Sequence, residues 1–386
     1  LSSSIAQSIQ EEDIVAVAIL SGNRNFDGRI HNLVRANYLM SPALVVAYAL
    51  AGSILIDLSR EPLGHDRDGH PVYLADLQPK AAEVDAWVAK HVGPAVFRSR
   101  IMASFTVPDG WQELDGGNGD IFSWNTNSTH VQRPPFLADL SAIQEAPHNI
   151  IGARALLILG DSITTDHISP VSEIPPDSEA GCYLISKGIA PTELGSYMTR
   201  RTNHNIMLRG TFANMRLRNE LVPGREGGVT RHMPDNREMS IHEAACCYAS
   251  EGTPLIVIAG SEYGAGSSRD WAAKGTRLLG IRAVLAESFE RIHRSNLIGM
   301  GVLPLQFESG VTRRSLYLRG EDSFDIVGLD HGLEPGQRVI VMIHRVDGRV
   351  DEATLICRID TAREFAWYRH GGIMPLAMRR LMEASV

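Results

Sequence analysis

One stretch of the chain, residues 255–275, constrains the fold more than any other. It opens with an apolar run from Leu255 to Ala259, which is typical of a buried strand. Three glycines then let the backbone turn, and Trp271 opens a segment with helical character. Three polar side chains therefore fall where a strand ends and a helix begins: Ser267, Ser268 and Arg269.

This triplet permits two interpretations. Unpaired backbone N–H groups and the positive end of the helix dipole favour a carboxylate, a phosphate or a serine alkoxide at such a place. Alternatively, a serine caps the helix and the arginine is solvated. Taken alone, the triplet favours the capping interpretation, whereas the motifs in the rest of the chain favour an anion site.

Length and composition set the broad class. A chain of 386 residues is long enough for at least two domains. Hydrophobic residues make up 44% and charged residues 21%, and no apolar run approaches the roughly 18 to 20 residues of a membrane helix. The net charge of -8 argues against a dedicated nucleic-acid or anionic-membrane surface, so an anionic ligand would depend on local arginines.

Cysteine use and the first residues indicate the setting of the chain. The four cysteines have neither a disulfide framework nor metal-ligand spacing: Cys182, Cys246, Cys247 and Cys357. We therefore expect the protein to be located in a reducing cytoplasm, and we expect these cysteines not to be metal ligands. The chain opens without a methionine or a signal-peptide pattern, so we expect it to be part of a longer polypeptide.

Apolar periodicity predicts an α/β fold in three parts, 1–57, 58–150 and 151–386. The first part holds a strand at 13–20 and a helix at 42–51, with Ser41 as its cap and Pro42 in its first turn. In the second part, proline, glycine and aspartate interrupt the periodicity, which predicts a long linker with little core of its own and one amphipathic helix at 80–91.

The third part alternates strands and helices at first and gathers strands toward its end. The predicted strands are 154–160, 255–260, 283–286, 303–306, 325–327, 338–344 and 352–358. The predicted helices are 271–279, 289–297, 362–369 and 375–383. Polar loops follow the early strands, and in open α/β sheets ligands bind at the carboxyl ends of strands.

Two further loops carry candidate chemistry. Arg24 and Arg29 flank a tight turn after Asn23 and could present two planar forks to separate carboxylates, although a solvated basic loop has the same pattern. Asp166 and His167 follow a predicted strand end and could relay protons or orient water. The alternative is a helix cap by Thr165 or Asp166, with the histidine packed.

Five ordered segments resemble the aconitase family, and the likeness runs from residue 1 to about residue 380. The segments are SGNRNFDGR (21–29), GDSITTDHISP (160–170), RGTFAN (209–214), the 255–275 stretch and AESFERIHRSN (286–296). The sequence between these segments is similar to the cytosolic and bacterial branch of the family. The resemblance covers only the C-terminal part of family members.

This resemblance implies a fold and an activity. The fold would be the tail of a three-layer α/β domain (1–57), a linker (58–150) and a C-terminal β/β/α swivel domain (151–386). The parent would be a hydro-lyase that interconverts citrate and isocitrate through cis-aconitate, with a [4Fe-4S] cluster whose cysteine ligands lie outside this chain. We expect the chain alone to be inactive without the missing N-terminal domains.

The resemblance also assigns roles to particular residues. Ser267 would be the catalytic base, ionised to an alkoxide whose charge the helix N-terminus, Arg269 and a nearby metal offset. The other catalytic candidates are Asp166 and His167. The residues expected to bind substrate are Asn23, Arg24, Arg29, Lys187, Ser268 and Arg269.

Two departures and two exclusions qualify the site. Lys187 stands where related sequences have an arginine, and it offers a point charge instead of a planar fork. Thr202 stands where the family has a glycine, a change that we interpret as harmless. His293 and Arg294 resemble catalytic residues, but their helical register beside Phe289 and Leu297 favours packing and capping roles.

Three rival functions remain on the sequence alone. An iron-sulfur 2-methylcitrate dehydratase shares the layout, and Thr164 to Pro170 leans weakly toward an aconitase proper. An isopropylmalate isomerase small subunit would resemble only the swivel domain, so the Asn23 loop argues against it. An RNA-binding regulator without a cluster is the third, and the negative net charge disfavours it.

Overall fold

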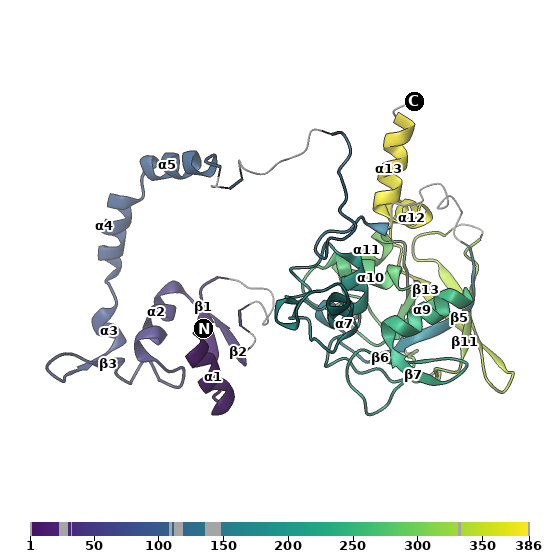
Figure 1. Ribbon diagram of the computed structural model, residues 1–386, viewed down its shortest axis with the longest axis horizontal. Helices are drawn as coiled ribbons and strands as arrows, with labels where there is room; N and C mark the ends of the chain where they lie inside the picture. Colours follow the sequence, from purple (N-terminus) through teal and green to yellow (C-terminus); the bar gives the residue numbers. More distant parts are fainter. Residues whose placement is uncertain are drawn as a thin grey trace. The chain divides into compact units, whose positions relative to one another are not determined.

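The computed structural model describes residues 2–22, 30–31, 33–107, 110–111, 119–135, 148–330 and 333–384. The chain forms two compact units, Leu1–Ser123 and Trp124–Val386 (Figure 1). Within the described residues, no helix combines the length and the apolar character that crossing a membrane requires. The predicted loop residues Asn23, Arg24 and Arg29 lie outside the described residues.

The first unit begins with a small βα arrangement. Helix α1 (Ser3–Glu11) precedes strands β1 (Val17–Leu20) and β2 (Ala36–Leu39), which pair in parallel. Helix α2 (Pro42–Ala51) follows, and the Ser41 hydroxyl accepts a hydrogen bond from the backbone N–H of Leu44 at 3.4 Å. The predicted helix, its serine cap and its proline are therefore confirmed, whereas the predicted strand is four residues long and begins at Val17.

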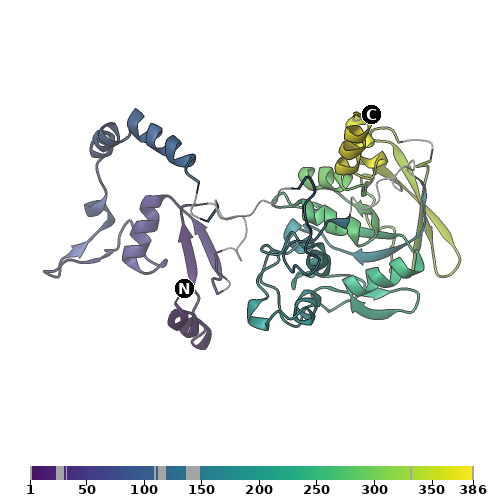
Figure 2. The ribbon, with the colours of Figure 1, turned by 45° about the horizontal axis from the view of Figure 1, so that its top comes forward.

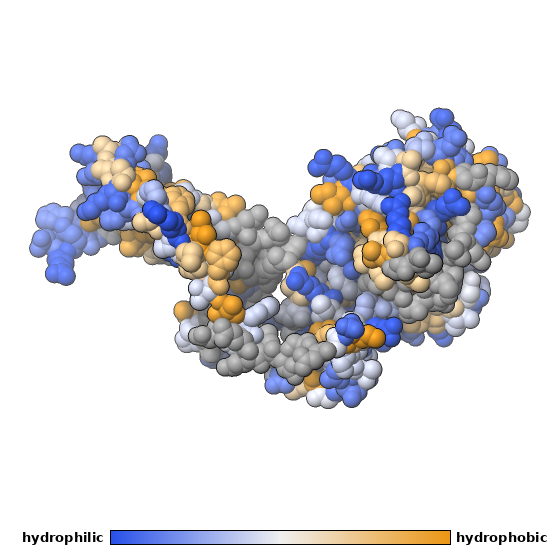
Figure 3. All heavy atoms as spheres, turned by 90° about the horizontal axis from the view of Figure 1, so that it is seen from above, coloured by the Kyte–Doolittle hydropathy of each residue, from blue (hydrophilic) through white to orange (hydrophobic). Residues whose placement is uncertain are grey.

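Short elements then extend along the rest of this unit. They are β3 (Gly64–His65), β4 (Pro71–Val72), α3 (Leu74–Leu77), α4 (Ala81–His91) and α5 (Pro94–Ser104). Helix α4 confirms the predicted helix, and α5 was not predicted because Pro94 suggested a break where it instead occupies the first helical turn. None of the described residues in α3, α4 and α5 is buried, and orange hydrophobic residues lie on the surface of this unit at the left of Figure 3.

The second unit is built on a closed seven-stranded barrel in the order β10-β13-β12-β11-β5-β8-β9. The strands are β5 (Ile150–Ile158), β8 (Leu255–Ala259), β9 (Ile281–Ala286), β10 (Leu303–Phe307), β11 (Ser323–Val327), β12 (Arg338–His344) and β13 (Val350–Cys357). Strands β5, β8, β9 and β10 pair in parallel, and the remaining pairs are antiparallel. All seven predicted strands of this part are confirmed, and β5 begins four residues earlier than predicted.

The two halves of the barrel differ in burial because helices cover only one of them. All five residues of β8 are buried, since Ile256 and Ile258 face the barrel interior while Leu255, Val257 and Ala259 pack under helices. In β12, buried and more exposed residues alternate, as expected for a strand with one solvated face. The continuous apolar run therefore identified the covered half.

Helices pack on the outer face of the parallel half (Figure 2). They include α9 (Ile241–Glu251), α10 (Asp270–Leu278) and α11 (Arg291–Gly299), and α12 (Ala362–Arg369) and α13 (Ile373–Ala384) end the chain. The four predicted helices of this part are confirmed within two residues at their first residue.

The segment between β5 and β8 holds elements that were not predicted. They are α6 (Thr165–Ile168), α7 (Glu179–Ser186), α8 (His204–Gly210), β6 (Val229–His232) and β7 (Arg237–Ser240), together with α9. Their cores form from residues of several elements at once, and short segments of this kind carry little periodicity of their own. This segment places α6 beside the carboxyl end of β8.

Candidate active site

The candidate site forms where two loops meet at the carboxyl ends of parallel strands. The loop after β8 runs from Gly260 to the start of α10, and the loop after β5 leads into α6. Thr165 donates its backbone N–H to the carbonyl of Ala265 at 2.8 Å, and Gly264 donates its N–H to the carbonyl of Ile163 at 2.7 Å. These bonds bring two predicted polar clusters, about 100 residues apart in sequence, side by side.

Ser267 lies two residues before the helix N-cap, Arg269, and is half-buried. The Thr165 hydroxyl donates to the backbone carbonyl of Ser267 at 2.8 Å, which fixes the loop at this residue. No described residue forms a hydrogen bond with the Ser267 hydroxyl itself. The hydroxyl is therefore available to a ligand, close to the positive end of α10.

Arg269 is the buried cation of the site. Its side chain is 8% exposed, and its guanidinium donates to the carbonyl of Ser169 and forms an ion pair with Asp166. The capping interpretation with a solvated arginine is therefore wrong for Arg269, because the side chain is buried between α6 and α10. The structure therefore pairs Asp166, a predicted catalytic residue, with Arg269, which was predicted to bind a substrate carboxylate.

The carboxylate of Asp166 remains 41% exposed, although it meets a buried guanidinium. A planar guanidinium presents five N–H donors in a fixed fork, and Arg269 directs it at the Ser169 carbonyl and at Asp166. These two contacts also fix the rotamer of Arg269 before any ligand arrives. Arg269 and Asp166 thus form a fixed polar pair near Ser267.

His167 and the N-cap residue Thr164 form a reciprocal capping box at the start of α6. Its Nδ1 accepts a hydrogen bond from the backbone N–H of Thr164 at 3.0 Å, and the Thr164 hydroxyl accepts from the His167 N–H at 3.2 Å. Burial lowers the pKa of His167, the charge of Asp166 opposes that shift, and Arg216 adds to it. The cap is therefore Thr164, not Thr165 or Asp166, and the imidazole is neutral near pH 7.

Two predicted binding residues are exposed. Ser268 is exposed on the loop, and Lys187 is exposed at the C-cap of α7. The Lys187 ammonium lies 5.8 Å from the ring centroid of Tyr183, whose ring also lies 4.4 Å from the guanidinium carbon of Arg209. Arg209, which the sequence placed in a motif without a role, therefore shares an aromatic neighbour with Lys187.

A small cavity of about 20 Å³ lies beside the Ser267 loop. Its lining comprises Thr165, Gly264, Gly266, Ser267, Ser268, Arg269, Glu290, Ile292, His293 and Asn296. His293 was predicted to pack and was left out of the site, and it is indeed buried, yet it lines this cavity. In the sequence, the one indication that His293 lies at the site was the presence of a histidine in helical register with apolar residues. Arg294, in contrast, points to Glu364 at 2.7 Å and joins α11 to α12.

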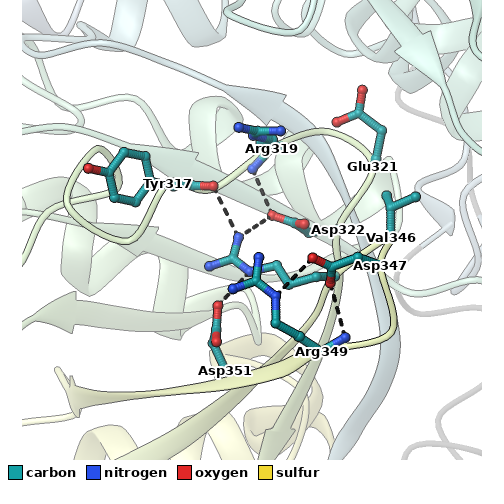
Figure 4. Close-up of a pocket in the computed structure, with 9 residues that line it drawn as sticks. Tyr317, Arg319, Glu321, Asp322, Val346, Asp347, Arg349 and Asp351 are labelled. Atoms are coloured by element: carbon teal, nitrogen blue, oxygen red, sulfur yellow. Dashed lines mark hydrogen bonds and ion pairs between the residues drawn. The ribbon is translucent and has the colours of Figure 1, made fainter.

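A larger cavity of about 730 Å³ lies at the β12–β13 hairpin (Figure 4). Its ionic side chains bind one another: Arg345 pairs with Asp322 and Asp351, each at 2.8 Å, and Arg349 pairs with Asp347 at 2.8 Å. With Arg319 and Glu321 included, the lining contains three arginines and four carboxylates. This cavity offers no excess positive charge for a polyanion.

The cysteines do not fit an iron-sulfur cluster. Within the described parts of the chain, one group of side chains is close enough to share a metal ion, the exposed Asp66, Asp68 and His70. Cysteine thiolates hold such clusters, whereas Cys357 is buried and burial raises the pKa of its thiol to about 11.

The chain belongs to the aconitase family: residues 180–310 match the Aconitase C-terminal domain and residues 3–52 match the Aconitase family (aconitate hydratase). Aconitate hydratase A of Escherichia coli (strain K12) is 52% identical over 379 residues, which are 98% of this chain and 42% of that protein. The enzyme of the same name from Thermus thermophilus is 49% identical over 99% of this chain and 42% of its own length. The chain thus spans less than half the length of these curated relatives.

Solved structures give a weaker likeness. A 3-isopropylmalate dehydratase from Methanocaldococcus jannaschii matches with a TM-score of 0.35 and 20% identity, over 61% of this chain and 98% of that chain.

Proposed function

We propose that this chain is the C-terminal part of an aconitate hydratase that interconverts citrate and isocitrate through cis-aconitate. The observation that carries the proposal is the meeting of Ser267, Arg269 and Asp166 at the N-terminus of α10. The names of relatives about 50% identical over nearly the whole chain support the same activity. The tricarboxylate would be the substrate, and the protein would act in the cytoplasm.

Ser267, ionised to an alkoxide, takes the proton from the carbon next to a substrate carboxylate and becomes a neutral hydroxyl. Its hydroxyl has no hydrogen bond to a described residue that would have to break first. The first N–H groups of α10 and the Arg269 guanidinium stabilise the serine alkoxide before the transfer and the negative charge that develops on the substrate during it. Ser268 donates a further hydrogen bond to the carboxylate.

Arg269 binds the substrate carboxylate through its planar N–H fork. Its guanidinium already contacts the Ser169 carbonyl and Asp166. Because these two contacts already fix the side chain, little rotamer freedom is lost when substrate binds. Asp166 orients Arg269 and presents its exposed oxygen to the reacting groups, while His167 holds the α6 turn in place. Asn23, Arg24, Arg29 and Lys187 would bind the other polar groups of the substrate.

The architecture follows the same proposal. Residues 1–57 would complete a three-layer α/β domain, 58–150 would be a linker, and 151–386 would be a β/β/α swivel domain that closes over the substrate. A [4Fe-4S] cluster would bind to thiolates outside this chain and would supply Lewis-acid chemistry at the substrate hydroxyl. N-terminal domains of the parent would therefore be obligatory partners.

Hydration of cis-aconitate by the full-length, cluster-loaded protein tests the proposal. We expect citrate and isocitrate to form from cis-aconitate, with 2-methyl-cis-aconitate a poor substrate. A protein that acts only on the methylated substrate would be a 2-methylcitrate dehydratase. A protein that binds RNA and hydrates neither substrate would contradict the proposal.

A further inference from the structure

His293 is a buried polar side chain without a partner. It lies on α11, is 1% exposed, and neither ring nitrogen has a hydrogen-bond partner among the residues that the structure describes. Buried polar groups are hydrogen-bonded in the great majority of cases, and a lost partner costs about 1 to 3 kcal/mol. An apolar side chain would pack here without that cost, so packing alone does not account for a histidine.

The neutral imidazole is able to bridge two groups. Burial lowers the pKa of His293 to about 4, so one ring nitrogen donates and the other accepts at neutral pH. The ring lies 5.3 Å from that of Tyr263, which in turn meets Phe289 edge-on at 6.1 Å. These contacts hold the ring in one place beside the loop that follows β8.

The cavity next to His293 has room for a water molecule. Its volume of about 20 Å³ exceeds the roughly 10 to 15 Å³ that one water occupies. Polar side chains and loop backbone line it along with His293, including Asn296 and Ser267. A buried water needs two to four polar partners, and this lining offers them.

The serine loop is also in direct contact with His293. Gly264 has a φ of +87°, and a Cβ at this residue would lie 2.3 Å from the Cβ, Cγ and Cδ2 atoms of His293. Only glycine fits both this backbone conformation and this approach. The position of the loop backbone is therefore set by the imidazole, three residues before Ser267.

From this geometry we infer that His293 is a positioning residue: it holds one buried water between its imidazole and the Gly264–Ser268 loop, and the two together orient the Ser267 hydroxyl. The inference rests on the proposed function, since it names what aligns the proposed base. His293 acts through the loop and does not touch the substrate. It accounts for the unpaired nitrogens, the small cavity and the close approach of Gly264 in one arrangement.

The test is a set of substitutions in the full-length, cluster-loaded enzyme. His293→Phe keeps an aromatic ring, removes both nitrogens and extends into the cavity. His293→Leu also removes both nitrogens but has a smaller side chain. For both we expect kcat for cis-aconitate hydration to fall about 10- to 100-fold, with KM within about twofold, because misplacement of a base affects the transition state most. His293→Asn and His293→Gln imitate the δ and ε nitrogens, so at least one of them should restore most of kcat.

A second readout does not depend on activity. Hydrogen–deuterium exchange of peptides that cover 262–270 should be faster in His293→Phe and His293→Leu than in the wild type, and the rescuing amide variant should restore slow exchange. His232→Phe is the matched control, since His232 is buried with its ring 4.4 Å from that of Tyr248 on other elements. It should leave kcat and the exchange of 262–270 unchanged.

The outcomes separate the two proposals. Wild-type kcat and wild-type exchange in His293→Phe or His293→Leu would overturn the positioning role, as would loss of kcat in both amide variants with normal exchange. A wild-type enzyme without hydratase activity would overturn the proposed function instead. In that case the exchange experiment still decides whether His293 holds the loop.

Discussion

At the scale of single residues, Ser267 is the side chain with the most specific role. Its alkoxide is proposed to remove a proton, whereas Ser268 beside it is exposed and is proposed only to bind the carboxylate. In the full-length enzyme, Ser267→Ala should lower kcat by at least about 100-fold with little change in KM, because the base acts in the transition state. Steady-state kinetics with isocitrate measures both constants.

Ser268→Ala is the matched control for this prediction. It should raise KM and lower kcat by less than tenfold, because one binding contact is lost but the base remains. Normal kcat with a raised KM in Ser267→Ala would mean that Ser267 only binds and that the base is elsewhere.

Lys187 tests a feature of this sequence in particular. If it faces the substrate, Lys187→Arg should lower KM for citrate about tenfold, since a bidentate guanidinium–carboxylate pair is worth about 1.4 kcal/mol more than a single ammonium contact. The kcat value should not change. Identical kinetics for Lys187→Arg, Lys187→Ala and the wild type would remove this exposed residue from the site.

His293 also makes stability depend on pH. Its pKa is about 4 in the folded state and 6.5 unperturbed, so the unfolded chain binds the proton more tightly. The free energy of unfolding is therefore constant above pH 6.5 with respect to this histidine. It falls by about 3 kcal/mol as the pH decreases toward 4. Urea unfolding from pH 7.5 to pH 4.5 should show this loss, and His293→Leu should reduce the slope; equal slopes would contradict the assignment.

At the scale of elements, one buried ion pair joins α11 to α12. Arg294 donates to Glu364 at 2.7 and 3.1 Å, and both side chains are about 10% exposed. Arg294→Met should lower the free energy of unfolding by about 3 kcal/mol, because it leaves the Glu364 carboxylate buried without its partner. Chemical denaturation measures this change.

The double variant Arg294→Met, Glu364→Leu provides the control for this prediction. It removes both charges, so it should recover most of the lost stability. If the double variant is as unstable as Arg294→Met, packing of the arginine stem rather than the charge pair explains the loss. Neither variant should alter KM, because the pair lies outside the candidate site.

At the scale of the whole molecule, the cysteines limit what the chain does alone. Within the described residues none of them belongs to a group that could hold a metal, and cluster assembly needs several thiolates together. The isolated chain, treated with iron and sulfide, should therefore show no visible cluster absorbance and no hydration of cis-aconitate. Stoichiometric cluster binding with hydratase activity would refute this expectation.

Sequence alone determined the barrel strands, the helices with clear apolar periodicity and the family to which the chain belongs. The apolar run 255–259 predicted a strand buried on both faces, and the residues after it predicted a helix start with Ser267 and Arg269 nearby. The order of polar motifs identified the family, which the comparisons confirmed. These features depend on neighbours within a few residues, so a pattern in the sequence reports them.

Only the tertiary structure decided which side chains meet. Arg269 pairs with Asp166, which is 103 residues away in the sequence. Closure of the barrel and the unpaired nitrogens of His293 likewise follow from the packing of distant strands and helices. The physical reason is that burial and ion pairing depend on position in space, which periodicity along the chain does not specify.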